Sequence, residues 1–273
     1  MHLRPDHAVR DIRTLHAFIR AHPLGLLTTS LPSEHHPTLQ CSHIPWVLDS
    51  KPSAQGNDPP FLGTLRGHIA RANPQSKAIV EAVTERPSSG ARADRKGTLL
   101  SEDVMIVFTS PVDHYITPSF YTQGKLGGKV APTWNYAAVQ VYGRAEIYHD
   151  SGDESTGAFL HQQLSDLARL GEEGVMGFQE DAAKVNGEGE GEGGHSPWKI
   201  ADAPKEYIAA LKKNIVGMRI EITRIEGRFK VSQERPVNDR SGVVEGLEGM
   251  QSDRAGQMAE FVKNGCVIER SRS

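Results

Sequence analysis

The chain is poor in cysteine and in long apolar runs, and both shortages exclude whole classes of protein. Cys41 and Cys266 are the two cysteines among 273 residues. This is too few for a disulfide framework, so a reduced, intracellular protein is expected. No segment approaches the roughly 20 apolar residues of a membrane-spanning helix, and the N-terminus lacks the apolar core of a signal peptide. We therefore expect a protein that spans no membrane and resides in the cytoplasm, with the nucleus as an alternative.

An excess of charge of one sign is also missing. The formal net charge is −3 and the isoelectric point is about 6.5, which provides no overall basic field for a nucleic acid. The sequence contains no helix-turn-helix, zinc module or basic helix. Direct DNA binding is therefore not supported by the sequence.

Motifs for metal binding and hydrolysis are scarce as well. Twelve histidines are present, but no H-E-x-x-H or C-x-x-C pattern occurs, so no metal site is expected. No G-x-S-x-G elbow is found either. Gly189 to Gly194 reads G-x-G-x-x-G, but it lies in acidic, glycine-rich sequence without a preceding strand, which argues against a dinucleotide fold. The sequence identifies no catalytic residue.

The segment from Lys129 to Asp150 carries the clearest strand pattern. Alternate positions are small or aliphatic, as expected for a strand with one buried face: Val139, Val141, Gly143, Ala145 and Ile147. A polar and aromatic group, Thr133 to Tyr136, leads into this strand. Such groups at the mouth of a barrel suit a planar cofactor. The alternative is that the aromatic rings belong to the core and the polar side chains tie a turn.

A second polar group follows the expected strand Phe61 to Arg66. His68, Arg71 and Asn73 stand where this strand leads into a helix, and together with the helix N-terminus they offer several donors to an anion such as phosphate. The alternative is structural, with Asn73 capping the helix and Arg71 pairing with a carboxylate.

Other elements follow from periodicity and turn residues. Helices are expected over residues 11–21, 75–83, 155–170, 204–213 and 252–264. Further strands are expected over 24–30, 39–48, 104–109 and 217–225, with 229–233 continuing the last one after a turn at Glu226 and Gly227.

Six segments, in order along the chain, resemble the PaiB family of FMN-binding split-barrel proteins, which are described as negative transcriptional regulators. The segments are HPLGLLTTS (22–30), SHIPWVLD (42–49), LRGHIARANPQ (65–75), YITPSFY (115–121), PTWNYAAVQVYGR (132–144) and IVGMRIEITRIEGRFKVSQERPVNDRSGVV (215–244). The resemblance implies a mainly β (α+β) fold, an antiparallel split β-barrel with peripheral helices. It also implies one domain over residues 1–250, with flexible insertions near 87–97 and 185–197, followed by an extension over 251–273.

The residue patterns and the resemblance together predict a set of FMN-binding residues: His43, His68, Arg71, Asn73, Lys129, Thr133, Trp134, Asn135, Gln140, Lys230, Ser232 and Gln233. Two positions depart from the family pattern. Gln140 stands where the family more often has histidine. Glu234 replaces the asparagine of the family segment K-L-S-Q-N-R, and its carboxylate would oppose a nearby phosphate.

The resemblance further implies a homodimer with FMN near the interface. An FMN-dependent oxidoreductase or flavin-handling protein is the first functional hypothesis, because the cofactor carries the redox chemistry. The second is a non-catalytic transcriptional regulator that responds to flavin or redox state. Haem is a third option, since related split barrels bind it, but no histidine can be assigned as an axial ligand. The substrate and the electron donor are not identified by the sequence.

Overall fold

The structure is a computed structural model that describes residues 1–50, 61–85, 97–122, 128–179 and 196–265. The expected insertions near 87–97 and 185–197 lie almost entirely outside these ranges, as does the end of the C-terminal extension. Across the ranges described, no helix combines the length and the apolar character that crossing a membrane requires.

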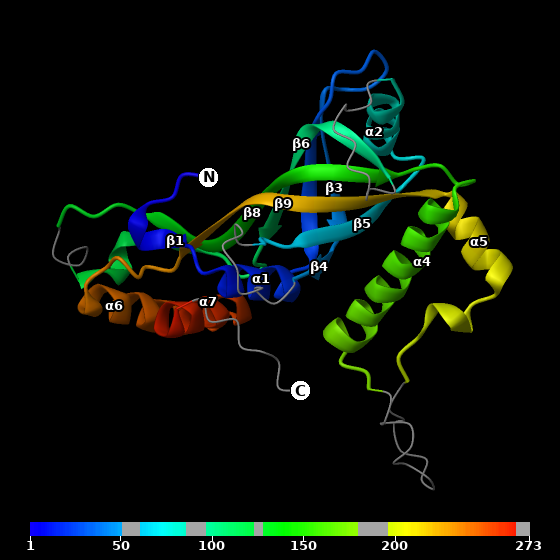
Figure 1. The fold of residues 1–273 in the computed structure, drawn as a ribbon. Coiled ribbons are helices and arrows are strands. Elements are labelled where there is room, and N and C mark those ends of the chain that lie inside the picture. The colour runs from blue at the N-terminus through cyan, green and yellow to red at the C-terminus, as the bar shows by residue number, and fades with distance from the viewer. Residues whose placement is uncertain (51–60, 86–96, 123–127, 180–195, 266–273) are drawn as a thin grey trace, which may run out of the picture. The chain divides into compact units, whose positions relative to one another are not determined.

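The strands form a sheet, and helices lie at its periphery (Figure 1). The strands are β1 (Ala8–Val9), β2 (Leu24–Ser30), β3 (Leu39–Pro45), β4 (Val47–Asp49), β5 (Thr64–Ala70), β6 (Thr98–Thr109), β7 (His114–Ile116), β8 (Thr133–Tyr148) and β9 (Ile215–Lys230). The helices are α1 (Ile12–Ala21), α2 (Pro74–Glu85), α4 (Glu154–Arg169), α5 (Lys205–Lys213), α6 (Val237–Glu248) and α7 (Asp253–Asn264). Short helical turns are η1 (Pro5–His7), η2 (Pro118–Phe120), η3 (Leu170–Val175) and η5 (Ile200–Asp202).

The strands follow the order β3-β2-β6-β8-β9-β5-β4, with β1 added to β9 and β7 added to β8. β5 pairs antiparallel with β9 over seven residue pairs, from Thr64 opposite Glu221 to Ala70 opposite Ile215. The pairs β1 with β9, β4 with β5 and β7 with β8 are antiparallel too. The predicted fold class, a mainly antiparallel split β-barrel with peripheral helices, is confirmed.

Contacts divide the chain into two compact units, which are described separately. Unit 1 comprises Met1–Gly25, Ile106–Val141 and Arg224–Ser273, and unit 2 comprises Leu26–Met105 and Tyr142–Thr223. The long strands β6, β8 and β9 supply residues to both units. The alternation predicted in β8 holds from Val139 to Ala145, where buried and half-buried positions alternate, but it ends there because Glu146 and Tyr148 are buried as well as Ile147.

In unit 1, helix α1 packs against the end of β9. The Asp11 carboxylate accepts the Thr14 backbone N–H at the helix start, and Phe18 contacts Phe229 with ring centroids 5.1 Å apart. The turn predicted at Glu226 and Gly227 is wrong, because β9 runs through both residues. A Cβ atom at Gly227 would lie 2.2 Å from Leu15 Cδ2. Glycine at this position therefore serves close packing against α1 and does not mark a turn.

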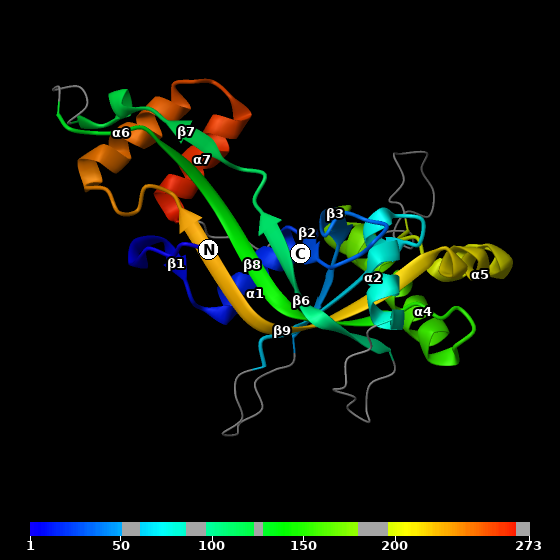
Figure 2. The same ribbon diagram turned by 90° about the horizontal axis from the view of Figure 1, so that it is seen from above.

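A second core in unit 1 joins the segment after β6 to the last two helices. It contains Val112, Ile116, Tyr121, Val243, Leu247, Ala255, Met258, Ala259 and Val262. Figures 1 and 2 show α6 and α7 side by side. Phe120 lies so close to α6 that a Cβ atom at Gly246 would be 2.3 Å from its ring. Helix α7 lies where the sequence pattern predicts a helix, whereas α6 was not predicted.

In unit 2, the strand predicted over 39–48 is divided into β3 and β4 at Trp46. The Trp46 ring is buried against Gly67, and the strand predicted over 61–66 occupies Thr64–Ala70 instead. Helix α4 is attached to β5 through Arg66, whose guanidinium contacts Asp49 at 2.6 Å and Asp166 at 2.8 Å. The helices predicted over 75–83, 155–170 and 204–213 correspond to α2, α4 and α5.

Candidate functional site

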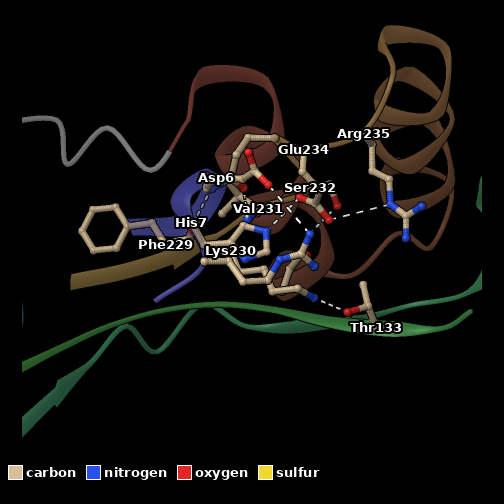
Figure 3. Close-up of polar contacts among 12 residues, drawn as sticks. Asp6, His7, Thr133, Phe229, Lys230, Val231, Ser232, Glu234 and Arg235 are labelled. Carbon is tan, nitrogen blue, oxygen red and sulfur yellow. Dashed lines mark hydrogen bonds and ion pairs between the residues drawn. The ribbon is translucent and has the colours of Figure 1, made fainter. Parts of the chain in front are cut away.

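The end of β9 and the start of β8 bring four predicted residues together in unit 1. We call Thr133, Asn135, Lys230 and Ser232 the Lys230 cluster; Figure 3 shows Thr133, Lys230 and Ser232. The Lys230 ammonium group donates hydrogen bonds to Thr133 Oγ1 and, at 2.9 Å, to the Trp134 carbonyl. Only 9% of Lys230 is exposed. The cluster therefore contains a cation that is largely withdrawn from water.

Asn135 and Ser232 form the second half of the cluster. Asn135 is fully buried, and its Nδ2 donates to Ser232 Oγ at 2.9 Å. Its Oδ1 is buried and has no hydrogen-bond partner. Ser232 has a φ of 63°, a left-handed conformation that is uncommon for a residue other than glycine. Strained residues of this kind concentrate at functional sites.

The charges around the cluster favour an electron-rich ligand. Burial lowers the pKa of Lys230, and Arg228, Arg235 and Arg4 lower it further, while Glu234 acts in the opposite direction. The Nε atoms of Arg228 and Arg235 are buried without a hydrogen-bond partner, although Arg235 forms an ion pair with Glu234 at 3.7 Å. The balance of nearby charge is positive, which suits an anion or the carbonyl groups of a ring.

Glu234, the residue predicted to oppose a phosphate, is engaged by His7. Its carboxylate lies 3.1 Å from His7 Nε2 (Figure 3). Burial acts to raise the pKa of Glu234, but hydrogen bonds from a backbone N–H and from His7, together with the charges of His7 and Lys230, lower it overall. Glu234 thus holds the N-terminal segment in place through the buried His7.

Gln233 connects the same segment to the turn after β9. Its Oε1 accepts the Val231 backbone N–H at 2.7 Å, and its Nε2 donates to the Asp6 carbonyl at 2.9 Å and to the Phe229 carbonyl. These contacts stabilise the turn that carries Ser232. Asp6 and His7 were not predicted from the sequence, because no motif marks the N-terminal segment.

Trp134 differs from its neighbours in the cluster. Adjacent residues of a strand point to opposite faces, and 51% of Trp134 is exposed. Its indole N–H donates to Asp113 Oδ1 at 2.7 Å, and its ring lies 6.1 Å from that of Tyr115 in an edge arrangement. Lys129 is exposed and Gln140 is half-buried, and their cofactor roles stay predictions.

The second predicted group lies in unit 2, between β5 and α2. Arg71 donates to three backbone carbonyls: His149 at 2.6 Å, Lys213 at 3.1 Å and Ile215 at 3.3 Å. Asn73 accepts the Gln75 N–H at the start of α2 and donates to Ser42 Oγ. Arg71 and Asn73 therefore have structural roles. The cap that Asn73 forms on α2 is the structural alternative that the sequence left open.

The two predicted histidines of unit 2 have different surroundings. Burial lowers the pKa of His68, and its Nδ1 is buried without a hydrogen-bond partner. His43 is exposed on the edge strand β3. Of the two, His68 has the environment expected for a ligand-binding side chain, because an unused buried donor or acceptor is costly unless something binds it.

Comparison with known proteins adds a family and several relatives. Residues 1–224 match a family described as "Putative FMN-binding domain". An uncharacterized protein of Aspergillus fumigatus is 45% identical over 266 residues, which covers 96% of this chain and 97% of that protein. The protease synthase and sporulation protein PAI 2 of Bacillus subtilis is 26% identical over 200 residues, covering 73% of this chain and 72% of that protein. Among solved structures, the flavocytochrome Anf3 of Azotobacter vinelandii gives a TM-score of 0.43 at 12% identity, covering 84% and 72% of the two chains.

Proposed function

The chain belongs to the PaiB-type family of FMN-binding domains, and we propose on this basis that it binds FMN and acts as a flavin-dependent oxidoreductase. The observation that carries the proposal is the Lys230 cluster. It combines a buried ammonium group with a buried amide oxygen that lacks a partner.

The groups in the cluster match the pyrimidine edge of a flavin ring. This edge presents hydrogen-bond acceptors at N1, at the C2 carbonyl and at the C4 carbonyl, with the N3–H donor between the two carbonyls. Lys230 supplies the one N–H that its bonds to Thr133 Oγ1 and the Trp134 carbonyl leave over, and Asn135 Oδ1 supplies the acceptor that an N3–H requires. An ionised phosphate presents acceptors, so it would leave Asn135 Oδ1 unsatisfied. The cluster therefore suits the ring better than the phosphate.

Bound FMN supplies hydride or single-electron transfer. The protein's contribution is electrostatic. Lys230 is held by Thr133 Oγ1 and the Trp134 carbonyl, so its charge has a fixed position and would face the edge of a bound ring. A preorganised charge in a dry site stabilises negative charge more strongly than the same charge in water. Lys230 would therefore favour the reduced, electron-rich form of the ring.

The predicted anion-binding group of unit 2 is a separate proposal, argued for that unit by itself. His68 has an unused buried Nδ1, and Nη1 of Arg71 takes no part in the three bonds that this side chain makes to carbonyls. Together with the N-terminus of α2 they offer N–H donors and positive charge to an anion.

Two ligands test the assignment of Lys230 to the ring. FMN and riboflavin share the ring, but only FMN carries the phosphate. We expect Lys230→Met to weaken both ligands about 10- to 150-fold, because a hydrogen bond to a charged group contributes about 1.5 to 3 kcal/mol. A loss of FMN binding alone would assign Lys230 to the phosphate instead of the ring. Titrations followed by flavin fluorescence measure both.

The matched control is Lys205→Met, which removes an exposed lysine of α5 and should leave both affinities unchanged. Absence of flavin binding by the wild-type protein, tested by absorbance and by melting temperature with added FMN, would refute the proposal. The same spectrum tests haem, whose intense Soret band differs from the two flavin bands.

We also propose that the protein is a homodimer, as the family resemblance implies. A ligand bound by the dimer alone would stabilise it by mass action. Light scattering after gel filtration should therefore give twice the mass of the 273-residue chain, with less dissociation on dilution when FMN is present. A monomer under both conditions would refute this part of the proposal.

A regulatory role is the second candidate, because the Bacillus relative is named a protease synthase and sporulation protein. The two candidates differ in turnover. The oxidoreductase predicts consumption of NADH or NADPH that depends on added FMN and on an electron acceptor. A regulator predicts flavin binding without turnover, together with a change in the affinity for a partner when the flavin is reduced.

A further inference from the structure

A bridge of charged and aromatic side chains connects helix α7 to the Lys230 cluster within unit 1. Arg254 donates from Nε to the Asp113 carbonyl at 2.9 Å and from Nη2 to Asp113 Oδ2 at 2.5 Å. The other carboxylate oxygen of Asp113 accepts the Trp134 indole N–H at 2.7 Å. Asp113 is therefore held by Arg254 on one side and holds Trp134 on the other.

The fixed indole restrains the backbone at Trp134. Trp134 pairs with Tyr115 across the β7–β8 ladder, and the Tyr115 ring contacts the indole edge. With its side chain held at the far end and its backbone held in the ladder, the residue has little freedom to twist. This matters because the Trp134 carbonyl accepts the Lys230 hydrogen bond at 2.9 Å, and such a bond weakens steeply when its geometry tilts.

Helix α7 is itself firmly anchored. Ala255, which follows Arg254, is fully buried in the second core of unit 1, together with Met258 and Ala259. The helix lies beyond residue 224, where the family match ends. Arg254 therefore lies in a part of the chain that the family match does not cover, whereas Asp113 and Trp134 lie within the match.

We propose that Arg254 and Asp113 are positioning residues for Lys230, acting through Trp134. The inference rests on the proposed role of Lys230 in binding the flavin, but its structural part concerns the protein without ligand. Arg254 fixes Asp113, Asp113 fixes the indole, and the indole fixes the carbonyl that directs the ammonium group. The C-terminal extension thus sets the geometry of the candidate site.

The first test needs no flavin. Brief acetylation of the native protein with acetic anhydride, read by mass spectrometry, reports how well each lysine amine is shielded. We expect Arg254→Ala to raise the labelling of Lys230 at least threefold, and Asp113→Asn to raise it less, since asparagine keeps an oxygen for the indole N–H. The control is Lys263→Ala. It removes the ion pairs of Lys263 with Glu248 and Glu260 and should leave Lys230 labelling unchanged.

The second test uses FMN. Arg254→Ala should raise the dissociation constants of FMN and riboflavin by the same factor, about three- to tenfold, and Arg254→Lys should restore part of the loss. Unchanged Lys230 labelling in Arg254→Ala, or equal labelling in Arg254→Ala and Lys263→Ala, would overturn the inference. If the wild-type protein binds no flavin, the proposed function fails, whereas the labelling result still decides whether Arg254 positions Lys230.

Discussion

The left-handed backbone at Ser232 leads to a prediction that reverses the usual ranking of alanine and glycine. Replacing Ser232 by alanine or by glycine removes Oγ equally, so each variant leaves the buried Asn135 Nδ2 without its acceptor. An unsatisfied buried group costs about 1 to 3 kcal/mol. Both variants should therefore unfold more easily than the wild-type protein.

The difference in unfolding free energy between the two variants isolates the cost of the left-handed backbone conformation at position 232. A non-glycine residue at φ 63° costs roughly 1 to 2 kcal/mol relative to ordinary conformations, whereas glycine loses about 0.5 to 1 kcal/mol through the greater freedom of the unfolded chain. The balance favours Ser232→Gly over Ser232→Ala by about 1 kcal/mol. Elsewhere in a protein, replacing glycine by alanine is normally neutral or stabilising.

Urea denaturation followed by circular dichroism measures both variants on one scale. Gln251 provides the control, because it is exposed and also has a positive φ, of 52°. Gln251→Gly should exceed Gln251→Ala in stability by a similar amount, with little loss relative to the wild-type protein. The reasoning fails if Ser232→Ala is as stable as Ser232→Gly while the Gln251 pair shows the expected order.

Three further predictions concern ionisable groups and packing. Burial acts to raise the pKa of Asp166, but hydrogen bonds from Gln162 and Arg66 lower it below 3.8. The ionised carboxylate therefore stabilises the fold above that pH, and its contribution is lost as the pH falls. The loss of stability caused by Asp166→Asn, measured by urea denaturation, should shrink between pH 6 and pH 3, and a constant loss would contradict the assignment. Burial lowers the pKa of His68 below 6.5, so the unfolded chain takes up a proton first and the stability falls as the pH drops through 6.5. His68→Gln should show a weaker pH dependence of stability in this window, and an unchanged dependence would contradict the prediction. Gly246→Ala should lower the melting temperature by several degrees, because its Cβ would lie 2.3 Å from the Phe120 ring, while Gly256→Ala, which meets nothing within 4 Å, should be neutral or stabilising.

Local sequence patterns predicted those elements whose structure depends mainly on residues within the same segment. Strand β8 was readable because small and aliphatic residues recur at every second position from Val139 to Ile147. The turn predicted at Glu226 and Gly227 failed because the role of this glycine depends on Leu15, which lies far away in the sequence. Helix α6 was missed for a related reason. Its sequence contains two glycines, which are poor helix formers, and its stability comes from packing against Phe120 and α7.

In the candidate site too, features within one segment were predicted, whereas contacts between distant segments were not. The polar group Thr133 to Tyr136 was visible in the sequence, and the family resemblance added Lys230 and Ser232. That Lys230 contacts Thr133 across 97 positions of sequence is a tertiary result, and no periodicity predicts it. The contact of His7 with Glu234, at 227 positions of separation, had no sequence signal at all. Such pairs are fixed by the path of β8 and β9.

The second core of unit 1 has a consequence for biosynthesis. Its early members, Val112 to Tyr121, leave the ribosome long before the late members, Val243 to Val262. Until α6 and α7 emerge, the early members lack these native partners, and the nascent chain must keep them from aggregating. This core is therefore completed only after residues up to Val262 have been synthesised.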